Sequence, residues 1–140
     1  MLPPIEKVYE AWTAIADNRV TLGDGEALVA SSDGAKTYTI RFRGDIYSST
    51  DNATFWRGYP GYPVLAVMML QGKLPLDRHE AEQWAGINWK EINTRHKNDY
   101  AKAVEEVETL RGIDPARASA AARQVMDALQ TLPLQIRRKI

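Results

Sequence analysis

Apolar and polar residues alternate regularly from Thr37 to Ile46, and this alternation limits the possible folds more than any other feature of the chain. The apolar positions are Tyr38, Ile40, Phe42 and Ile46, and the polar positions are Thr37, Thr39, Arg41 and Arg43. Successive side chains of a strand point to opposite faces of a sheet, so one face would be buried and the other exposed to water. This pattern predicts a long strand in an antiparallel sheet.

Two shorter segments before this strand also have the period of a strand. Val20 and Leu22 indicate a first short strand, and residues 26–31 indicate a second. The Asp33-Gly34 pair lies between the second strand and the long strand, where this dipeptide favours a tight hairpin turn. Residues 19–49 are therefore predicted to form antiparallel strands with a hairpin around Asp33-Gly34.

Helical periodicity marks the segments on either side of these strands. Within residues 1–17, apolar residues recur three or four positions apart, as in an amphipathic helix: Ile5, Val8, Tyr9, Trp12, Ile15 and Ala16. Residues 63–72 are apolar on all sides, and Pro63 and Gly72 suit the two ends of a short buried helix. A buried strand is the alternative, although the alanine, methionine and leucine content favours a helix.

The C-terminal half, residues 77–132, carries clear signals for the ends of helices. Asp77 and Asn88 are each followed three residues later by glutamate, which is the pattern of a capping box. A long helix is predicted over residues 89–111, and Gly112-Ile113-Asp114-Pro115 would end it and begin a last helix over residues 115–131. We expect these two helices to pair as an antiparallel hairpin, with residues 133–140 as a tail.

Together these segments predict a single α+β domain over residues 1–140. Its small antiparallel sheet would pack against an N-terminal helix, a short buried helix and a C-terminal helical hairpin. Hydrophobic residues make up 44% of the 140 positions, which is sufficient for a substantial core at this length.

Composition and terminal sequence exclude several classes of function. The chain has no cysteine, so disulfides, cysteine zinc sites and thiolate nucleophiles are excluded. Eighteen basic residues balance 18 acidic residues, whereas a dedicated nucleic-acid binder usually has a basic excess, so nucleic acid is an unlikely partner. The N-terminal residues do not resemble a signal peptide, and the longest apolar run is too short to span a bilayer. These observations predict a soluble cytoplasmic protein without membrane contact.

An aromatic loop at residues 50–63 is the strongest candidate for a functional site. Loops are normally polar, and this one carries four aromatic rings beside an arginine, so it could grip a small molecule or a protein. The candidate ligand-binding residues are Asp51, Asn52, Trp56, Arg57, Tyr59 and Tyr62, together with Arg41 and Arg43 on the polar strand face. The alternative is structural: Asp51 would cap a helical turn that ends at Gly58, and two Tyr-Pro turns, with cis proline a possible feature, would lead into the buried helix.

Evidence for catalysis in the sequence is weak. Asp51, Asn52 and Arg57 could form the polar pocket of a small enzyme, so enzymatic activity stays an open alternative. His96 falls on the apolar stripe of the predicted long helix, where a core histidine is more common than a general base, and only Asp99 could share its face. No spacing of histidine and acidic residues matches a known metal motif, and no phosphate-binding loop is present, so no metal or cofactor is predicted.

The sequence also allows partners larger than a small molecule. Trp84 and Trp89 flank Gly86 and would be hard to bury in a small domain, so they suggest a homo-oligomer contact, unless they cover the first helix. A weaker alternative is nucleic-acid binding through the basic residues of the long helix and of the tail, Arg137, Arg138 and Lys139. A binding or interaction module that uses the aromatic loop is the leading hypothesis.

Overall fold

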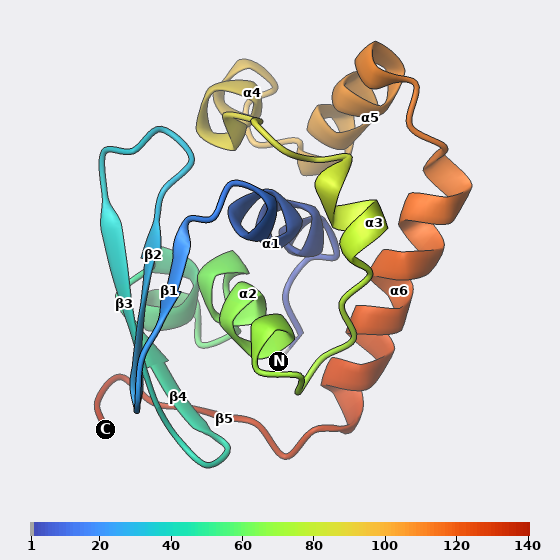
Figure 1. Ribbon diagram of the computed structural model, residues 1–140. Coiled ribbons are helices and arrows are strands. Elements are labelled where there is room, and N and C mark those ends of the chain that lie inside the picture. Colours follow the sequence, from blue (N-terminus) through green and yellow to red (C-terminus); the bar gives the residue numbers. More distant parts are fainter. Residues whose placement is uncertain (1) are drawn as a thin grey trace.

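The computed structural model describes residues 2–140 and has a mixed α+β architecture (Figure 1). A five-stranded sheet has the order β1-β2-β3-β4-β5, and the helices gather on one side of it. The predicted fold class is therefore confirmed.

The sheet contains β1 (Val20–Leu22), β2 (Glu26–Ala30), β3 (Thr37–Arg43), β4 (Ile46–Ser49) and β5 (Gln135–Ile136). The first four strands follow one another in antiparallel hairpins, and β5 pairs with β4 in parallel. Ile40, at the centre of β3, lies opposite Ala27 on one side and Ser49 on the other, on the face that is buried. The predicted alternation is thus correct, with Arg41 and Arg43 exposed on the opposite face.

Two features of the sheet differ from the prediction. The single long strand is two strands, because Gly44 adopts a left-handed conformation with φ 60° and turns the chain between Arg43 and Ile46. The tail is not free after Pro133, because Gln135 N donates to Asp45 O at 2.9 Å and Arg137 N donates to Tyr47 O at 2.9 Å. A two-residue strand is too short to leave a periodic signal in the sequence.

Helices α1 (Glu6–Ala16) and α2 (Tyr62–Leu70) form the centre of the molecule. Every residue of α1 from Val8 to Ile15 is buried, and α2 is buried from Pro63 to Met69. Because α2 packs between α1 and the sheet, it has no face toward water, which explains its apolar sequence on all sides. The buried helix predicted at residues 63–72 is therefore confirmed.

The C-terminal half contains α3 (Arg78–Glu82), α4 (Trp89–Arg95), α5 (Tyr100–Arg111) and α6 (Pro115–Thr131). The predicted caps are present, since the side chains of Asp77, Asn88 and Asp114 accept hydrogen bonds from Glu80 N, Glu91 N and Ala116 N. Gly112 is left-handed, with φ 67°, at the end of α5. The predicted connector between the last two helices is therefore confirmed.

The long helix predicted over residues 89–111 is wrong, because the chain breaks between α4 and α5. Lys97 and Asn98 have positive φ values of 54° and 65°, and Asp99 caps a new helix by accepting from Lys102 N at 3.3 Å. Asparagine tolerates the left-handed conformation better than most residues, and aspartate is a strong cap. α5 packs against both α1 and α4, and α6 packs against α1, so α5 and α6 do not run along each other as the predicted extended pair.

The tryptophans at the Gly86 turn are buried rather than exposed. Trp84 is 0% and Trp89 is 3% exposed, and their rings stack with centroids 6.0 Å apart. Trp84 also contacts Tyr9 and Trp12 of α1, which agrees with the alternative that these rings cover the first helix. They consequently offer no surface for the homo-oligomer contact that their sequence position suggested.

The aromatic loop is partly structural. Residues Ala53–Arg57 form a π-helical turn, η1, which ends at the left-handed Gly58. Asp51 is 5% exposed and accepts hydrogen bonds from Ser49 Oγ, Thr54 N and Thr54 Oγ1. Asp51 therefore holds the turn together, as the structural alternative proposed. Every peptide bond within residues 2–140 is trans, so the suggested cis proline is wrong.

Replacing Asp51 with alanine should destabilise the protein by about 3 kcal/mol, because it leaves three buried donors without their acceptor. Urea denaturation measures this loss. Asp45→Ala, at the exposed turn between β3 and β4, is the control and should change stability by less than about 0.5 kcal/mol. A stable Asp51→Ala protein would show that this carboxylate does not hold the loop.

Two acidic side chains are buried near Tyr9, on the side of α1 away from the sheet. Glu80 is 4% and Glu108 is 8% exposed. Burial raises the pKa of both carboxyl groups, and for Glu108 the charges of Glu105 and Glu80 act in the same direction. Burial, with the charge of Glu108, also raises the pKa of the Tyr9 hydroxyl to about 12.

Glu108→Gln should therefore stabilise the protein more at pH 8 than at pH 4. A carboxyl with a raised folded-state pKa stabilises the fold below its unfolded pKa, and this contribution is lost as pH rises through the folded pKa. Urea denaturation at both pH values measures the difference, with the exposed Glu82→Gln on α3 as the control. Equal effects of Glu108→Gln at pH 4 and pH 8 would contradict the raised pKa.

Candidate functional site

A polar cavity of about 330 Å³ lies where α1, the β2–β3 hairpin, the start of α2 and the α4–α5 segment meet. Its lining includes four basic side chains, Lys7, Arg19, Lys36 and Lys90, and one acidic side chain, Glu10. Side chains from segments that are far apart in the sequence thus converge on one partly open cavity. Such convergence of charged, amide and phenol groups is typical of a ligand site.

Lys7 and Glu10 form a buried ion pair on one turn of α1. Lys7 Nζ lies 3.3 Å from Glu10 Oε2, and the two side chains are only 13% and 8% exposed. Burial raises the pKa of Glu10, against the opposing charge of Lys7. Burial, the largest single effect, lowers the pKa of Lys7, but the charge and hydrogen bond of Glu10 together with the charges of Tyr100 and Tyr59 raise that pKa overall. Lys7 Nζ also lies 4.4 Å from the centre of the Tyr100 ring, which fixes the ammonium at the cavity wall.

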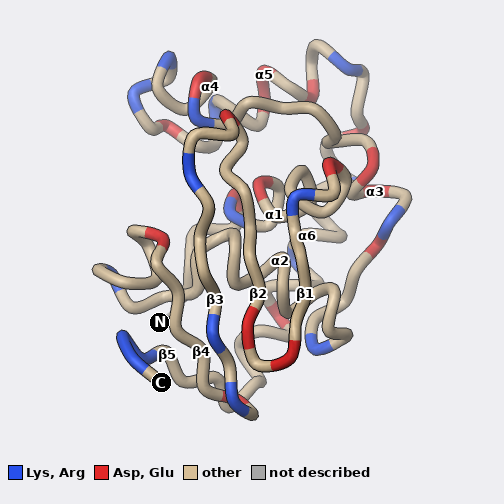
Figure 2. Tube along the Cα trace, turned by 60° about the vertical axis from the view of Figure 1, so that its left-hand side comes forward, with Lys and Arg blue, Asp and Glu red and all other residues tan. Residues whose placement is uncertain are grey.

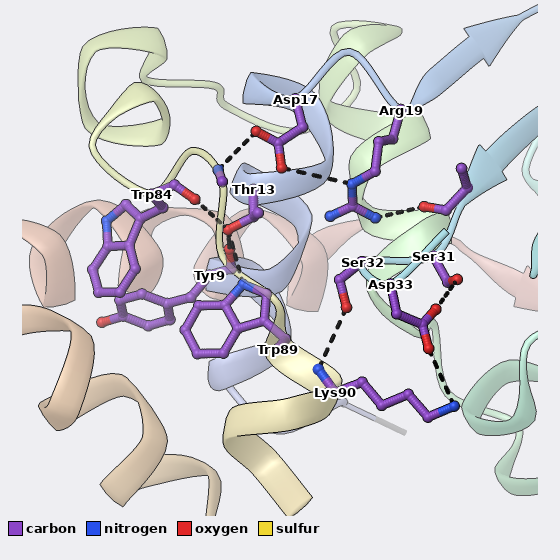
Figure 3. Close-up of polar contacts among 12 residues, drawn as sticks. Tyr9, Thr13, Asp17, Arg19, Ser31, Ser32, Asp33, Trp84, Trp89 and Lys90 are labelled. Atoms are coloured by element: carbon purple, nitrogen blue, oxygen red, sulfur yellow. Dashed lines mark hydrogen bonds and ion pairs between the residues drawn. The ribbon is translucent and has the colours of Figure 1, made fainter. Parts of the chain in front are cut away.

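Arg19 enters the cavity from the turn after α1, where Asn18 is left-handed with φ 53°. One guanidinium nitrogen, Nη1, donates to Ala30 O of β2, and Nε lies 3.8 Å from Asp17 Oδ2 (Figure 3). Nε and Nη2 are both buried, and neither has a hydrogen-bond acceptor within residues 2–140. A buried cation with donors left over can bind an anionic or carbonyl oxygen.

The β2–β3 hairpin forms a second wall and is attached to α4 (Figure 3). Asp33 accepts hydrogen bonds from Ala35 N at 3.0 Å and from Ser31 Oγ at 2.7 Å, and these bonds lower its pKa to about 2. Its other oxygen lies 3.3 Å from Lys90 Nζ, while Lys90 N donates to Ser32 Oγ at 3.4 Å. The hairpin predicted at Asp33-Gly34 therefore positions Ser31 and Lys90 at the cavity.

Phenol and amide groups complete the lining. Tyr38 and Tyr62 lie edge to face with centroids 6.3 Å apart. Their hydroxyls are donors at neutral pH, as phenols ordinarily are, and burial raises the pKa of both further. Asn93 is 9% exposed, and its Oδ1 has no donor within residues 2–140. The cavity thus offers unused acceptors as well as donors, so it favours a ligand with both kinds of group.

Thr13 of α1 fixes the position of Trp89 at the base of this site (Figure 3). Thr13 Oγ1 donates to Trp84 O at 2.6 Å and accepts from Trp89 Nε1 at 2.8 Å. Asp17 accepts from Gly86 N at 2.8 Å and adds a second link between the end of α1 and the same turn. These bonds hold the start of α4 against α1.

The structure brings only two of the eight predicted site residues into this cavity, Asn52 and Tyr62. Asp51 is buried within the loop, Trp56 and Arg57 are exposed, and Tyr59 is partly buried. The three residues of the enzyme alternative therefore do not form one pocket. Asp51 bonds within the loop, Asn52 lies at the cavity and Arg57 faces water. Arg41 lies on the outer face of the sheet, and Arg43 is exposed at the end of β3.

His96 has a different role from the core position expected for it. It ends α4, and its Nε2 lies 2.9 Å from Glu106 Oε1, while Arg95 makes two hydrogen bonds of 2.9 and 2.8 Å to the same carboxylate. Arg95, followed by His96, lowers the pKa of Glu106 to about 2. This ion cluster links α4 to α5 and does not line the polar cavity. Within residues 2–140, no three histidine or acidic side chains are grouped to hold a metal ion.

Sequence reasoning did not identify the residues that dominate the cavity: Lys7, Glu10, Arg19, Lys36, Lys90, Asn93 and Tyr100. Lys7 and Glu10 look like the exposed face of an amphipathic helix, and their spacing of three residues was the one available signal. The other residues become neighbours only through the tertiary fold.

The family model described as uncharacterised conserved protein UCP014422 matches residues 1–135. The chain belongs to this family. No curated protein and no solved structure matches it. The part matched to UCP014422 includes every residue that lines the polar cavity, whereas Arg137, Arg138 and Lys139 follow it. Among the helices of residues 2–140, none is both long enough and apolar enough to cross a membrane.

Thr13→Val should destabilise the protein by about 2 kcal/mol, because it leaves the buried Trp89 Nε1 without an acceptor while keeping the side-chain shape. Urea denaturation followed by tryptophan fluorescence measures this effect. Thr21→Val on the exposed face of β1 is the matched control and should have little effect. If both variants were equally stable, the Thr13 hydroxyl would not hold α4 in place.

Proposed function

We propose that the protein is a small-molecule binding module and that the polar cavity is its ligand site. The observation that carries this proposal is the Arg19 guanidinium beside a cavity of about 330 Å³: Nη2 is buried without an acceptor within residues 2–140, and Nε has only Asp17 Oδ2 at 3.8 Å. Leaving buried polar groups unpaired destabilises a fold, so their retention beside a cavity supports a binding role.

The lining favours a ligand with an anionic group, either a carboxylate or a phosphate. Lys7, Lys90 and Arg19 each have a carboxylate partner, but Arg19 Nη2 has no acceptor, and Lys36 stands at the cavity without an ion pair in residues 2–140. The Tyr38 and Tyr62 hydroxyls can donate to the same group, because a phenol is protonated at neutral pH and burial raises the pKa of both. Asn93 Oδ1 can accept from a hydroxyl or amine elsewhere on the ligand.

The aromatic loop contributes to this site from its inner side. Asn52 and Tyr62 line the cavity, while Trp56 points outward and is 65% exposed. The binding hypothesis that the sequence suggested is therefore kept, but its centre moves from the exposed rings to Arg19 and Tyr62.

Thermal denaturation with sodium phosphate or sodium succinate, at constant ionic strength, tests the proposal. A ligand that binds only the folded state raises the melting temperature, and wild type should respond to at least one of these anions. Arg19→Met should weaken the response at least tenfold in anion concentration, since it removes a charge-assisted hydrogen bond. Tyr62→Phe should weaken it less and tests the site without removing charge.

Arg123→Met is the matched control, because Arg123 is exposed on α6 and does not line the cavity. It should respond to the anions as wild type does. An anion response that is the same in wild type, Arg19→Met and Tyr62→Phe, or that is absent from wild type, would contradict binding in the cavity.

A further inference from the structure

The outer face of the sheet, opposite the helices, carries a shallow groove of about 460 Å³ that the polar cavity does not use. Thr39, Arg41, Ser48 and Thr50 line it from β3 and the β4 segment, and Phe55 and Arg138 line it from η1 and from the chain after β5. We call it the outer groove. Helices α1–α6 lie on the opposite side of the sheet, and η1 reaches this face only at the edge of the groove through Phe55, so a partner can approach it from solvent.

Pairing of β5 with β4 places the basic tail beside the aromatic turn. Arg137 N is bonded to Tyr47 O, which fixes the chain just before Arg138. Arg138 Nε then donates to Phe55 O at 3.2 Å, and its guanidinium carbon lies 5.3 Å from the centres of both the Phe55 and Trp56 rings. The sequence separates these groups by more than 80 residues, and the fold turns them into one arginine–aromatic cluster.

Positive charge dominates around the outer groove. Arg41 and Arg43 lie on β3, and the basic residues of the tail lie on the other side of β4 (Figure 2). The ordered partner of Arg41 is Glu26, at 3.2 Å, but the two side chains are 62% and 49% exposed. Such an exposed ion pair is weak, so a phosphate can replace the carboxylate. The acidic residues Asp24 and Glu26 lie at the β1–β2 turn, away from the tail.

We propose that the outer groove, with the Trp56 ring beside its lining residue Arg138, binds single-stranded nucleic acid, with Arg41 and the tail arginines on the phosphates and a base stacked on Trp56. Trp56 is 65% exposed, so its ring is accessible to a flat partner. Cations that follow a groove, together with an exposed aromatic ring, are the two elements of a single-strand platform. A duplex hides the faces of its bases, and an acidic peptide has no base to stack, so neither uses both elements.

This surface also revises the expectation from the sequence. Tyr38 and Phe42 of β3 point to the buried face, as predicted, and they cannot stack on bases. Phe55 and Trp56 supply the aromatic surface instead, from a turn that the sequence did not place near the tail. The proposal is independent of the polar cavity, because the two sites share no lining residue.

Fluorescence anisotropy of the full chain with a fluorescein-labelled 12-nucleotide oligo(dT) tests the proposal. If four phosphates are contacted, raising NaCl from 50 to 200 mM should weaken binding about 50-fold. Trp56→Ala should weaken it about tenfold through loss of stacking, and Arg138→Gln should weaken it and reduce its salt dependence. Leu110→Ala and Arg123→Gln, exposed on α5 and α6, are the matched controls and should bind as wild type does.

Competition with unlabelled molecules distinguishes the possible partners. Unlabelled oligo(dT) should displace the probe more effectively than a duplex of the same length or a 12-residue polyglutamate peptide. Failure of wild type to bind at 50 mM NaCl, or equal competition by polyglutamate, would overturn the proposal, as would unchanged binding by Trp56→Ala. Arg19→Met should leave this binding unchanged, so failure here is distinguishable from failure of the cavity proposal.

Discussion

The Thr13 hydroxyl makes the contact on which the rest of the structure depends. It lies on the buried central helix α1 and satisfies two groups of the Gly86 turn, Trp84 O and Trp89 Nε1. Thr13 is a polar residue on an otherwise apolar face of α1. A buried polar group must meet its hydrogen-bond partners, so it favours one packing arrangement over the others that an apolar face would allow. Because Trp89 begins α4, the same contact determines where Lys90 and Asn93 lie.

Hydrogen bonding of the side chains differs between the Gly86 turn and the polar cavity. At the Gly86 turn, Thr13 and Asp17 meet specific partners at 2.6 to 2.8 Å. At the polar cavity, Arg19 and Asn93 keep buried atoms without partners in residues 2–140. The first set stabilises the fold. Trp84 Nε1 at the Gly86 turn also lacks a partner in residues 2–140, so the feature that favours a ligand site is that Arg19 and Asn93 line the cavity. The outer groove adds a separate surface, which depends on β5 to bring the tail to η1.

Much of the fold could be predicted because its signals are local. The helix caps act within one turn, as at Asp77, Asn88 and Asp114. The apolar sequence of α2 by itself predicts that this helix is buried. The break at Lys97 and Asn98 could not be predicted, because the apolar spacing continues through it and neither residue requires a positive φ. The turn at Gly44 was not predicted for a similar reason, because the alternation of apolar and polar residues from Tyr38 to Ile46 remains in phase across it. Of the candidate site, the sequence supplied Asn52 and Tyr62, which stand in a loop of unusual composition, whereas Glu10 and Arg19 gain their surroundings from distant segments.

Native mass spectrometry of gently purified protein tests most directly whether the polar cavity is a ligand site. Wild type and Arg19→Met, purified side by side, would be compared for a retained small mass. Our account predicts additional mass on wild type that is absent from a folded Arg19→Met protein. The same mass on both proteins, or a wild-type protein with none, would contradict the account.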